Sequence, residues 1–355
     1  MKGGREEAGG WRQVNRLLNI RSVRRAIELE SGSDAPLSVR LRAWRLGFTS
    51  ESYRLYDLDH NDPRSYLPDA ARFAQPRIEG GFARILADKA LFSTVVGAHV
   101  RVPKVLAIIA SGRLCATQSP PVVRDVESLI RYCEGSSGVI IKPAQGSRGL
   151  RVRKLHVERG RLLLNGRATD ANEIERRLAR MDDFVVTEVI EQAGYAARIF
   201  PDSANTVRIV TMQDPDDGNR PFIPVATHRF GVRDSAPTDN WARGGLDTKI
   251  DLATGRLSRA KRNPRISSAA VERHPDTDAM IEGVTIPHWR EVHAAILRLA
   301  STFSFLTFVG WDVIVTDDGM AVIEGNNPPD RVIQKEHPFM ADPRARRFFE
   351  TMMAR

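Results

Sequence analysis

An α+β fold is predicted by two features of the sequence. Strand-like and helix-like segments alternate from about residue 104 to the C-terminus, and the strands of the later half have the pattern of antiparallel hairpins. No repeat of about 20 to 50 residues is visible, which argues against a solenoid or a propeller. The chain has 355 residues, 42% hydrophobic and 27% charged, which is the ordinary composition of a globular protein with a packed core.

The N-terminal part of the chain has the spacing of helices. Residues 82–96, which follow the Gly80-Gly81 break, also predict a helix. We therefore expect a helical N-terminal region over residues 1–80. Its apolar side chains recur every three or four positions, at Leu17, Leu18, Ile20, Val23 and Ile27, and again at Leu41, Trp44, Leu46 and Phe48.

The segments that follow alternate between strand and helix patterns. We assign residues 81–345 to the main domain and residues 346–355 to a C-terminal helix or tail. Helices are predicted over residues 122–133, 171–181 and 287–302. Strands are predicted over residues 104–110, 138–142, 150–157, 161–164, 184–190, 204–212, 222–230, 308–316 and 320–325.

The net charge of +9 favours anionic partners, such as phosphates, nucleotides or acidic glycans and lipids, without choosing among them. Residues 1–45 hold ten basic and five acidic side chains, which is more typical of a solvated helix face than of a binding surface. No run of about 18 apolar residues occurs, and the first residues lack the apolar core of a secretory signal. We therefore expect a cytoplasmic protein with no membrane span and no specific nucleic-acid partner. The two cysteines, Cys115 and Cys133, exclude a disulfide framework.

The sharpest chemical pattern lies near the C-terminus, in the stretch FVGWDVIVTDDGMAVIEGNN. A three-residue Asp-Asp-Gly turn pairs Thr316 with Met320 and sets Asp312 opposite Glu324. Strand alternation puts Asn326 on the same face, and two directly opposed carboxylates favour a divalent cation between them. All-oxygen ligands of this kind suit magnesium or manganese. The alternative is a two-residue turn, which sends the two acids to opposite faces of the hairpin.

A lysine followed by glycines ends one apolar strand, in the stretch VIIKPAQGSRGL. The ammonium of Lys142 is costly at that position unless it meets an anion, and Gly146, Ser147 and Gly149 permit a close backbone approach to phosphate oxygens. The stretch is not a Walker A loop. A surface lysine in a β-turn accounts for these residues equally well, so the phosphate prediction depends on the acid pair elsewhere in the chain.

Two further strands carry polar side chains among apolar neighbours. The strand FVVTEVIE contains Glu188 and Glu191 near its end, which predicts contacts to a purine edge or a ribose hydroxyl, or alternatively a plain strand terminus. Asn205 and Arg208 lie on the later strand SANTVRIVT, and Arg229 lies on its partner strand. Because an arginine among apolar residues usually has an anionic partner, we expect either a bound anion or an internal salt bridge.

Taken in order, these features resemble the ATP-grasp superfamily. The order comprises an Asp88-Lys89 helix, the Lys142 strand with its glycine loop, the Glu188 strand end, and the hairpin with Asp312, Glu324 and Asn326. The stretches SANTVRIVT, DNWARGGL, IDLATGRL, IPHW and VGWDVIVTDDGMAVIEGNNPPD are similar to the narrower sugar-transfer-associated ATP-grasp group, from about Tyr53 to the C-terminus. The resemblance implies an ATP-grasp fold, in which two α+β subdomains grip ATP, with a helical N-terminal region.

The resemblance also implies ATP-dependent activation of a carboxylate. ATP phosphorylates the carboxylate to an acylphosphate, a nucleophile attacks it, and ADP and phosphate leave. The partners implied are ATP, a small or carrier-linked carboxylate on a glycan, peptide or lipid-linked precursor, and an amine or thiol. The alternatives are an ATP-grasp kinase acting on a hydroxyl and a non-catalytic protein that binds a polyanion or a nucleotide.

The resemblance assigns roles by position. Magnesium, or alternatively manganese, is held by Asp312, Glu324 and Asn326, and Arg208 stabilises charge on the transferred phosphoryl group. Asp330 is left outside the metal set because it can equally cap a turn. The residues assigned to nucleotide binding are Lys89, Lys142, Gly146, Ser147, Gly149, Glu188, Val189, Ile190, Glu191 and Asn205.

The loop of residues 234–245 is rich in glycine, proline and small polar residues around one large aromatic, Trp241. Such a composition predicts a mobile loop that burial does not hold rigid. We expect it to close over the acceptor and to bring Arg243 towards the phosphates as a catalytic cation. The alternative is a fixed connection with Trp241 docked permanently in the core.

Overall fold

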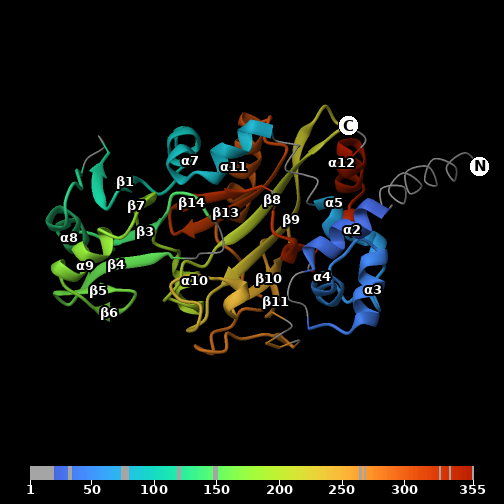
Figure 1. Cartoon of the computed structure of the whole chain (residues 1–355), viewed down its shortest axis with the longest axis horizontal. Coiled ribbons are helices and arrows are strands. Elements are labelled where there is room, and N and C mark those ends of the chain that lie inside the picture. Colours follow the sequence, from blue (N-terminus) through green and yellow to red (C-terminus); the bar gives the residue numbers. More distant parts are fainter. Residues whose placement is uncertain are drawn as a thin grey trace, which may run out of the picture.

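Two seven-stranded antiparallel sheets with helices on their faces form the protein (Figure 1). The predicted α+β class is confirmed. The computed structural model describes residues 20–30, 34–72, 80–117, 121–146, 151–263, 266–267, 269–327, 329–335 and 337–353. Residues 1–19, 31–33 and 73–79 of the expected helical region lie outside these ranges.

The first sheet is built from the middle of the chain and has the strand order β2-β1-β7-β3-β4-β5-β6. Helices α8 (Val126–Glu134) and α9 (Ala171–Leu178) pack on it, with Leu129 and Ile174 in one core with Ile109 of β1. The strands are β1 (Val105–Ala110), β2 (Arg113–Ala116), β3 (Val139–Pro143), β4 (Arg153–Glu158), β5 (Arg161–Leu164), β6 (Arg167–Ala168) and β7 (Phe184–Glu188).

The second sheet is built from the later half of the chain and has the strand order β12-β11-β10-β9-β8-β13-β14. Strands β10, β11 and β12 were not predicted, because charged and polar residues interrupt their short apolar runs. The strands are β8 (Val207–Asp214), β9 (Arg220–Phe230), β10 (Leu246–Ile250), β11 (Leu257–Lys261), β12 (Ala270–Val271), β13 (Phe308–Thr316) and β14 (Gly319–Asn326).

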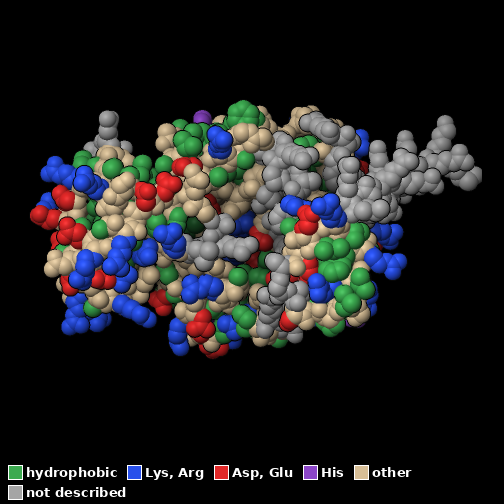
Figure 2. Space-filling view, in the orientation of Figure 1, with side chains coloured by type: hydrophobic (Ala, Val, Ile, Leu, Met, Phe, Trp, Pro, Cys, Tyr) green, Lys and Arg blue, Asp and Glu red, His purple; other side chains and the backbone are tan. Residues whose placement is uncertain are grey.

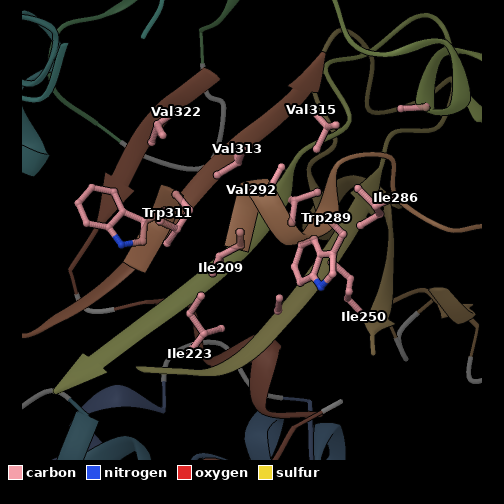
Figure 3. Close-up of a cluster of buried hydrophobic side chains, with 14 of the residues drawn as sticks. Ile209, Ile223, Ile250, Ile286, Trp289, Val292, Trp311, Val313, Val315 and Val322 are labelled. Atoms are coloured by element: carbon pink, nitrogen blue, oxygen red, sulfur yellow. The ribbon is translucent and has the colours of Figure 1, made fainter. Parts of the chain in front are cut away.

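Helix α11 (Trp289–Thr302) packs against one face of the second sheet (Figure 3). Trp289 and Val292 of the helix share a buried core with Ile209 of β8 and Trp311 of β13. Successive side chains of a strand point to opposite faces. The neighbours of these two strand residues in the sequence therefore lie on the other face, and they include the polar residues of the site.

That other face is covered at one end by helix α12 (Pro343–Met353). Phe348 of α12 packs in one buried cluster with Val210 and Met212 of β8. The boundary expected between residues 345 and 346 falls inside this helix, which completes the core on this side of the sheet.

The N-terminal region is helical, with α2 (Ile20–Leu29), α3 (Leu37–Arg45), α4 (Ser50–Leu55) and α5 (Asp69–Arg72). Phe48, Tyr53, Tyr56 and Tyr66 form its own small core. The remaining helices are α6 (Ala83–Ala87), α7 (Lys89–Val95) and α10 (Gly194–Ile199), with single 3-10 turns at η1 (Pro63–Ser65), η3 (Gly80–Phe82), η4 (Val96–Ala98), η5 (Trp241–Arg243), η6 (Arg331–Lys335) and η7 (Phe339–Ala341).

A buried glutamine joins the N-terminal helices to the second sheet. Gln334 of η6 is 0% exposed, and its side chain accepts a hydrogen bond from the backbone N–H of Leu67 at 2.7 Å. Its amide nitrogen donates to the carbonyl oxygen of Leu67 at 3.2 Å and to the hydroxyl of Tyr56 at 3.3 Å. Leu67 also packs into the α12 core, so the helical region is fixed against the sheet by both polar and apolar contacts.

The helix predicted over residues 82–96 is broken at Asp88, so the prediction of one continuous helix is wrong. Asp88 is extended, and its carboxylate accepts hydrogen bonds from the backbone N–H groups of Ala90 and Leu91 at 2.9 and 3.1 Å. This N-cap starts a new helix, α7. The backbone N–H of Lys89 then donates to the carbonyl oxygen of Ala144 at 2.9 Å, which ties the helix start to the loop after β3.

The hairpin of β13 and β14 confirms that Asp312 pairs with Glu324, but by a different route. Thr316 pairs with Gly319, so the turn has two residues and the predicted three-residue turn is wrong. A β-bulge at Ile323 adds one unpaired residue to β14 and restores the register. Because a shift of one residue reverses every side chain, the short turn and the bulge together put the two acids on one face.

Candidate active site

A cleft of about 1040 Å³ lies between the two sheets and the N-terminal helices. Lys142 lines it from the first sheet, and Arg208 and Glu324 line it from the second. Leu29 and Leu55 line it from helices α2 and α4. The cleft therefore collects residues from the whole length of the chain.

Polar side chains form a row across the second sheet at the cleft. Glu324 of β14 pairs with Asp312 of β13, and Asp312 pairs on its other side with Arg208 of β8. Arg208 in turn pairs with Thr227 of β9. All four residues line the cleft, because residues paired across antiparallel strands lie on the same face.

Two arginines bind the carboxylate of Asp312. Arg208 makes two hydrogen bonds to it, of which Nη2 to Oδ2 is 2.9 Å, and Nη2 of Arg229 donates to Oδ2 at 3.0 Å. The side chains of Arg208 and Asp312 are 7% and 1% exposed. Burial raises the pKa of Asp312, but the two guanidinium groups outweigh this and hold that pKa below its ordinary value. The expected internal salt bridge is therefore present, and both arginines also face the cleft.

Glu324 and Asn326 lie beside this ion pair on the same face. Nδ2 of Asn326 donates to Oε1 of Glu324 at 3.3 Å. Burial and the adjacent Asp312 carboxylate raise the pKa of Glu324. A divalent cation would offset the repulsion between the two carboxylates, so the predicted grouping of two acids and an amide is present in a chemically suitable arrangement.

The number of acidic side chains available as ligands indicates which metal ion suits this site. Across the part of the chain that the structure describes, no group of three or more His, Cys, Asp or Glu side chains is arranged to hold a metal ion. An ion at Glu324 would therefore have at most two carboxylates and an amide from the protein. Magnesium fits such a site, because it keeps several waters and usually uses one or two carboxylates together with substrate phosphates.

Two lysines line the cleft, one from a strand of the first sheet and one from helix α7. Lys142 lies in β3, and Nζ of Lys89, at the start of α7, donates to the carbonyl oxygen of Gly146 at 3.1 Å. Gly146 has φ of +125°, a conformation that favours glycine. Burial lowers the pKa of Lys142 to about 8 and also lowers that of Lys89, although Glu324 opposes both shifts. Two neighbouring, partly desolvated ammonium groups favour an anion between them.

The pKa of Lys142 predicts how nucleotide affinity depends on pH. Below about pH 8 the free protein holds the ammonium form that phosphates bind, whereas at higher pH binding must first take up a proton. We expect ATP affinity to fall up to about tenfold per pH unit above that pKa. Isothermal titration across this range measures the effect. Lys142→Arg stays charged and should lose the alkaline fall, whereas an equal fall in this variant would contradict the assignment to Lys142.

The end of β7 forms another part of the cleft. Glu188, Val189, Ile190 and Glu191 all line it, as the sequence predicts for residues that contact one ligand. Oε1 of Glu188 accepts a hydrogen bond from the backbone N–H of Lys104 at 3.0 Å. The last three of these residues follow the end of the strand ladder, so a flat ring can approach their backbone from the cleft.

Two predicted site residues lie apart from the cleft lining. Asn205 is 1% exposed, and its amide group donates to the carbonyl oxygen of Phe200 at 2.6 Å and accepts from the N–H of Gly231 at 3.0 Å. These hydrogen bonds join separate backbone segments, and the Asn205 side chain does not line the cleft. Arg243 is exposed on η5 and does not line the cleft. Outside the described residues lie Ser147 and Gly149.

Part of the loop of residues 234–245 is buried, which its composition did not predict. Ser235 is 0% exposed and Asp239 is 7% exposed. The carboxylate of Asp239 accepts a hydrogen bond from the backbone N–H of Thr206 at 2.9 Å. The composition did not indicate this burial, because small polar side chains are buried here through hydrogen bonds rather than apolar contacts. Trp241 lies at the cleft wall rather than in the core.

The sequence-based site set omitted a buried ion pair beneath Trp241. Nζ of Lys335 lies 2.6 Å from Oδ2 of Asp247, and the two side chains are 5% and 3% exposed. It also omitted Arg229, although period-two spacing from Thr227 places Arg229 on the cleft face of β9. No such pattern points to Lys335, because it comes from η6 outside the sheet.

Comparisons with solved structures found similar chains at low identity. A D-cycloserine synthetase has 11% identity and a TM-score of 0.42, with 86% of this chain and 93% of that chain covered. A D-Ala:D-Ser ligase from Enterococcus faecalis has 12% identity and a TM-score of 0.40, with 76% and 60% covered.

The chain spans less than half the length of two further structures. These are N5-carboxyaminoimidazole ribonucleotide synthetases, the second from Thermotoga maritima, at 9% and 11% identity. The match covers 70% of this chain and 46% and 44% of those chains, with TM-scores of 0.38 and 0.36.

Sequence comparison gives the family. A search of curated proteins found no significant match. The model of the sugar-transfer associated ATP-grasp family matches residues 70–337, which include both sheets and the polar row of the cleft. Since this match covers well over half of the chain, the protein belongs to the sugar-transfer associated ATP-grasp family.

Proposed function

We propose that this protein is an ATP- and magnesium-dependent ligase that activates a carboxylate as an acylphosphate for attack by an amine or another nucleophile. One observation carries the proposal. Lys142 of the first sheet, Lys89 of helix α7 and the Asp312, Glu324 and Asn326 face of the second sheet line a single cleft, in a chain of the ATP-grasp family. Phosphates and their metal need this combination of cations and oxygen ligands.

The position of each residue in the cleft suggests its role in the proposed reaction. Lys89 and Lys142 neutralise phosphate charge, and the backbone after Glu188 receives the purine edge. Asp312, Glu324 and Asn326 would hold magnesium, which would supply positive charge at the phosphoryl group. Arg208 and Arg229 keep the Asp312 carboxylate ionised and add positive potential on the cleft face.

The proposed reaction has two steps. An oxygen of the substrate carboxylate attacks the γ-phosphorus, and the bond to the β,γ-bridging oxygen breaks to release ADP. The nucleophile then attacks the carbonyl carbon, loses a proton, and displaces phosphate. The phosphate released therefore carries one oxygen that came from the carboxylate.

This oxygen distinguishes the ligase from the alternatives. With an ¹⁸O-labelled carboxylate substrate, the ligase transfers label to inorganic phosphate in proportion to product. An ATP-grasp kinase acting on a hydroxyl instead leaves an unlabelled phosphoryl group on its substrate. Mass spectrometry of both products separates the two reactions, and absence of ADP with every acceptor class would favour a protein that only binds nucleotides or polyanions.

Nucleotide binding itself is testable by thermal unfolding. We expect saturating Mg-ATP to raise the melting temperature by roughly 2 °C or more, because a ligand that binds only the folded state stabilises it. Lys142→Ala should remove most of this shift, since it deletes a phosphate partner. Lys249→Ala, an exposed lysine of β10 outside the cleft, should keep it. Equal melting temperatures with and without Mg-ATP in the unmodified protein would reject the proposal.

A further inference from the structure

Helices α2 and α3 expose apolar side chains on the outside of the N-terminal region. Ile27, Leu37 and Leu41 are 45%, 62% and 49% exposed. Leu37 and Leu41 lie one turn apart on α3 and therefore share a face. In Figure 2 hydrophobic side chains gather over the N-terminal helices, with Lys and Arg side chains near them. An exposed cluster of this kind is typical of an interaction surface.

The same two helices are strongly basic. Together they carry six arginines and one glutamate. Glu28 pairs with both Arg24 and Arg25, and the Arg24 side chain remains 81% exposed. Arg45 is exposed, and on α3 it follows Leu41 by one turn. We call Ile27, Leu37, Leu41, Arg24, Arg42 and Arg45 the α2–α3 surface, in which Arg42 lies 3.5 Å from the exposed Asp59 and stays 56% exposed.

We propose that the α2–α3 surface docks on an anionic lipid bilayer. Arginines attract the acidic headgroups, and the exposed leucines enter the boundary between headgroups and acyl chains. A nucleic acid would use the arginines but would leave the leucines unpaired with any apolar group. No helix within the described ranges has the length and apolar character to cross a bilayer, so the contact we propose is with the membrane surface.

The docking surface and part of the cleft wall belong to the same packed group of N-terminal helices. Leu29 of α2 and Leu55 of α4 line the cleft, whereas Leu37 and Leu41 point outward from the adjacent α3. In Figure 1 these helices lie at the end of the molecule opposite the first sheet, which supplies Lys142 to the cleft. Docking would thus bring one side of the cleft close to molecules carried by the bilayer. This is the side farther from the proposed nucleotide site. The docking itself does not depend on the proposed ligase activity.

Vesicle sedimentation tests the proposal with the full chain. We expect the protein to sediment with vesicles of phosphatidylcholine mixed with phosphatidylglycerol and to remain in solution with phosphatidylcholine alone. Leu37→Asp/Leu41→Asp should weaken binding at least about tenfold, because it removes the apolar contact and adds two negative charges. Leu91→Asp is the matched control, since Leu91 of α7 is 48% exposed but lies outside the surface.

Several results would overturn the proposal. They are equal binding to neutral vesicles, equal loss of binding in the Leu91 control, or full binding by the double variant. A dimer in lipid-free light scattering that the double variant abolishes would assign the surface to self-association instead. The melting temperature and its Mg-ATP shift should be unchanged in the double variant. This readout separates failure of docking from misfolding and from failure of the proposed nucleotide function.

Discussion

Replacing Asp312 with alanine is expected to destabilise the folded protein by about 3–5 kcal/mol. The substitution removes the carboxylate that binds Arg208 and Arg229 and leaves two guanidinium groups facing each other without it. Arg208 is only 7% exposed, so water replaces little of the lost interaction. Burial alone lowers the pKa of Arg229, and the carboxylates around it, including Asp312, raise it again. The charged arginine therefore depends on these acids.

Urea unfolding of the two proteins measures this loss as a change in the free energy of unfolding. Asp34→Ala provides the matched control, because Asp34 forms an exposed ion pair with Arg54 at 3.2 Å. Such a surface pair contributes about 0–1 kcal/mol. If Asp312→Ala costs no more than Asp34→Ala, the buried pair does not stabilise the sheet. Asp312→Asn should lie between them, because an amide oxygen still accepts hydrogen bonds from the arginines.

Replacing Glu324 with glutamine is expected to slow ADP release from Mg-ATP by on the order of 100-fold or more while leaving the fold intact. In the proposed site the Glu324 carboxylate binds magnesium together with Asn326, and a glutamine amide does not supply its negative charge. Burial and repulsion from Asp312 raise the pKa of Glu324. A neutral glutamine therefore removes this repulsion in the metal-free protein. Loss of turnover should therefore come without loss of stability.

Isothermal titration separates the metal role from the nucleotide role. In Glu324→Gln, ATP affinity measured with EDTA should match the unmodified protein, whereas the gain on adding magnesium should be lost. Glu158→Gln makes the same change on an exposed residue of β4 outside the cleft and should alter neither quantity. If Glu324→Gln mainly weakens metal-free nucleotide binding and Lys142→Ala mainly abolishes turnover, the two roles have been exchanged.

Local patterns in the sequence predict most of the sheet strands near the site. The apolar runs that become β3, β7, β8 and β13 were located to within a few residues, because each is bounded by turn residues or charge. Strands β10 and β11 were not, since the polar positions of β10 are buried by pairing with β9 and β11 rather than by apolar character. The break at Asp88 was also missed. An aspartate among apolar residues at helical spacing is compatible with one continuous helix, so the sequence does not show that it caps a new one.

The residues of the candidate site were likewise only partly predictable from the sequence. The prediction that Asp312, Glu324 and Asn326 share one face is correct, but the turn from which it was argued is wrong and a bulge restores the register. Residue chemistry and strand alternation did not show that Asn205 turns inward to hold backbone groups, because an amide can serve a ligand or a turn equally well. Nor did they show Lys335, whose partner Asp247 is 88 residues away along the chain.

The sequence by itself determined the α+β class, the acidic hairpin and the lysine strand, because these depend on residue type and on periods of a few positions. The tertiary structure alone decided how the hairpin reaches its register, through a two-residue turn compensated by a bulge at Ile323. It alone paired Arg208 with Asp312, which lie 104 residues apart, and set the N-terminal helices against the cleft through Gln334. These contacts depend on which strands become neighbours, and that choice is made by packing of the whole chain.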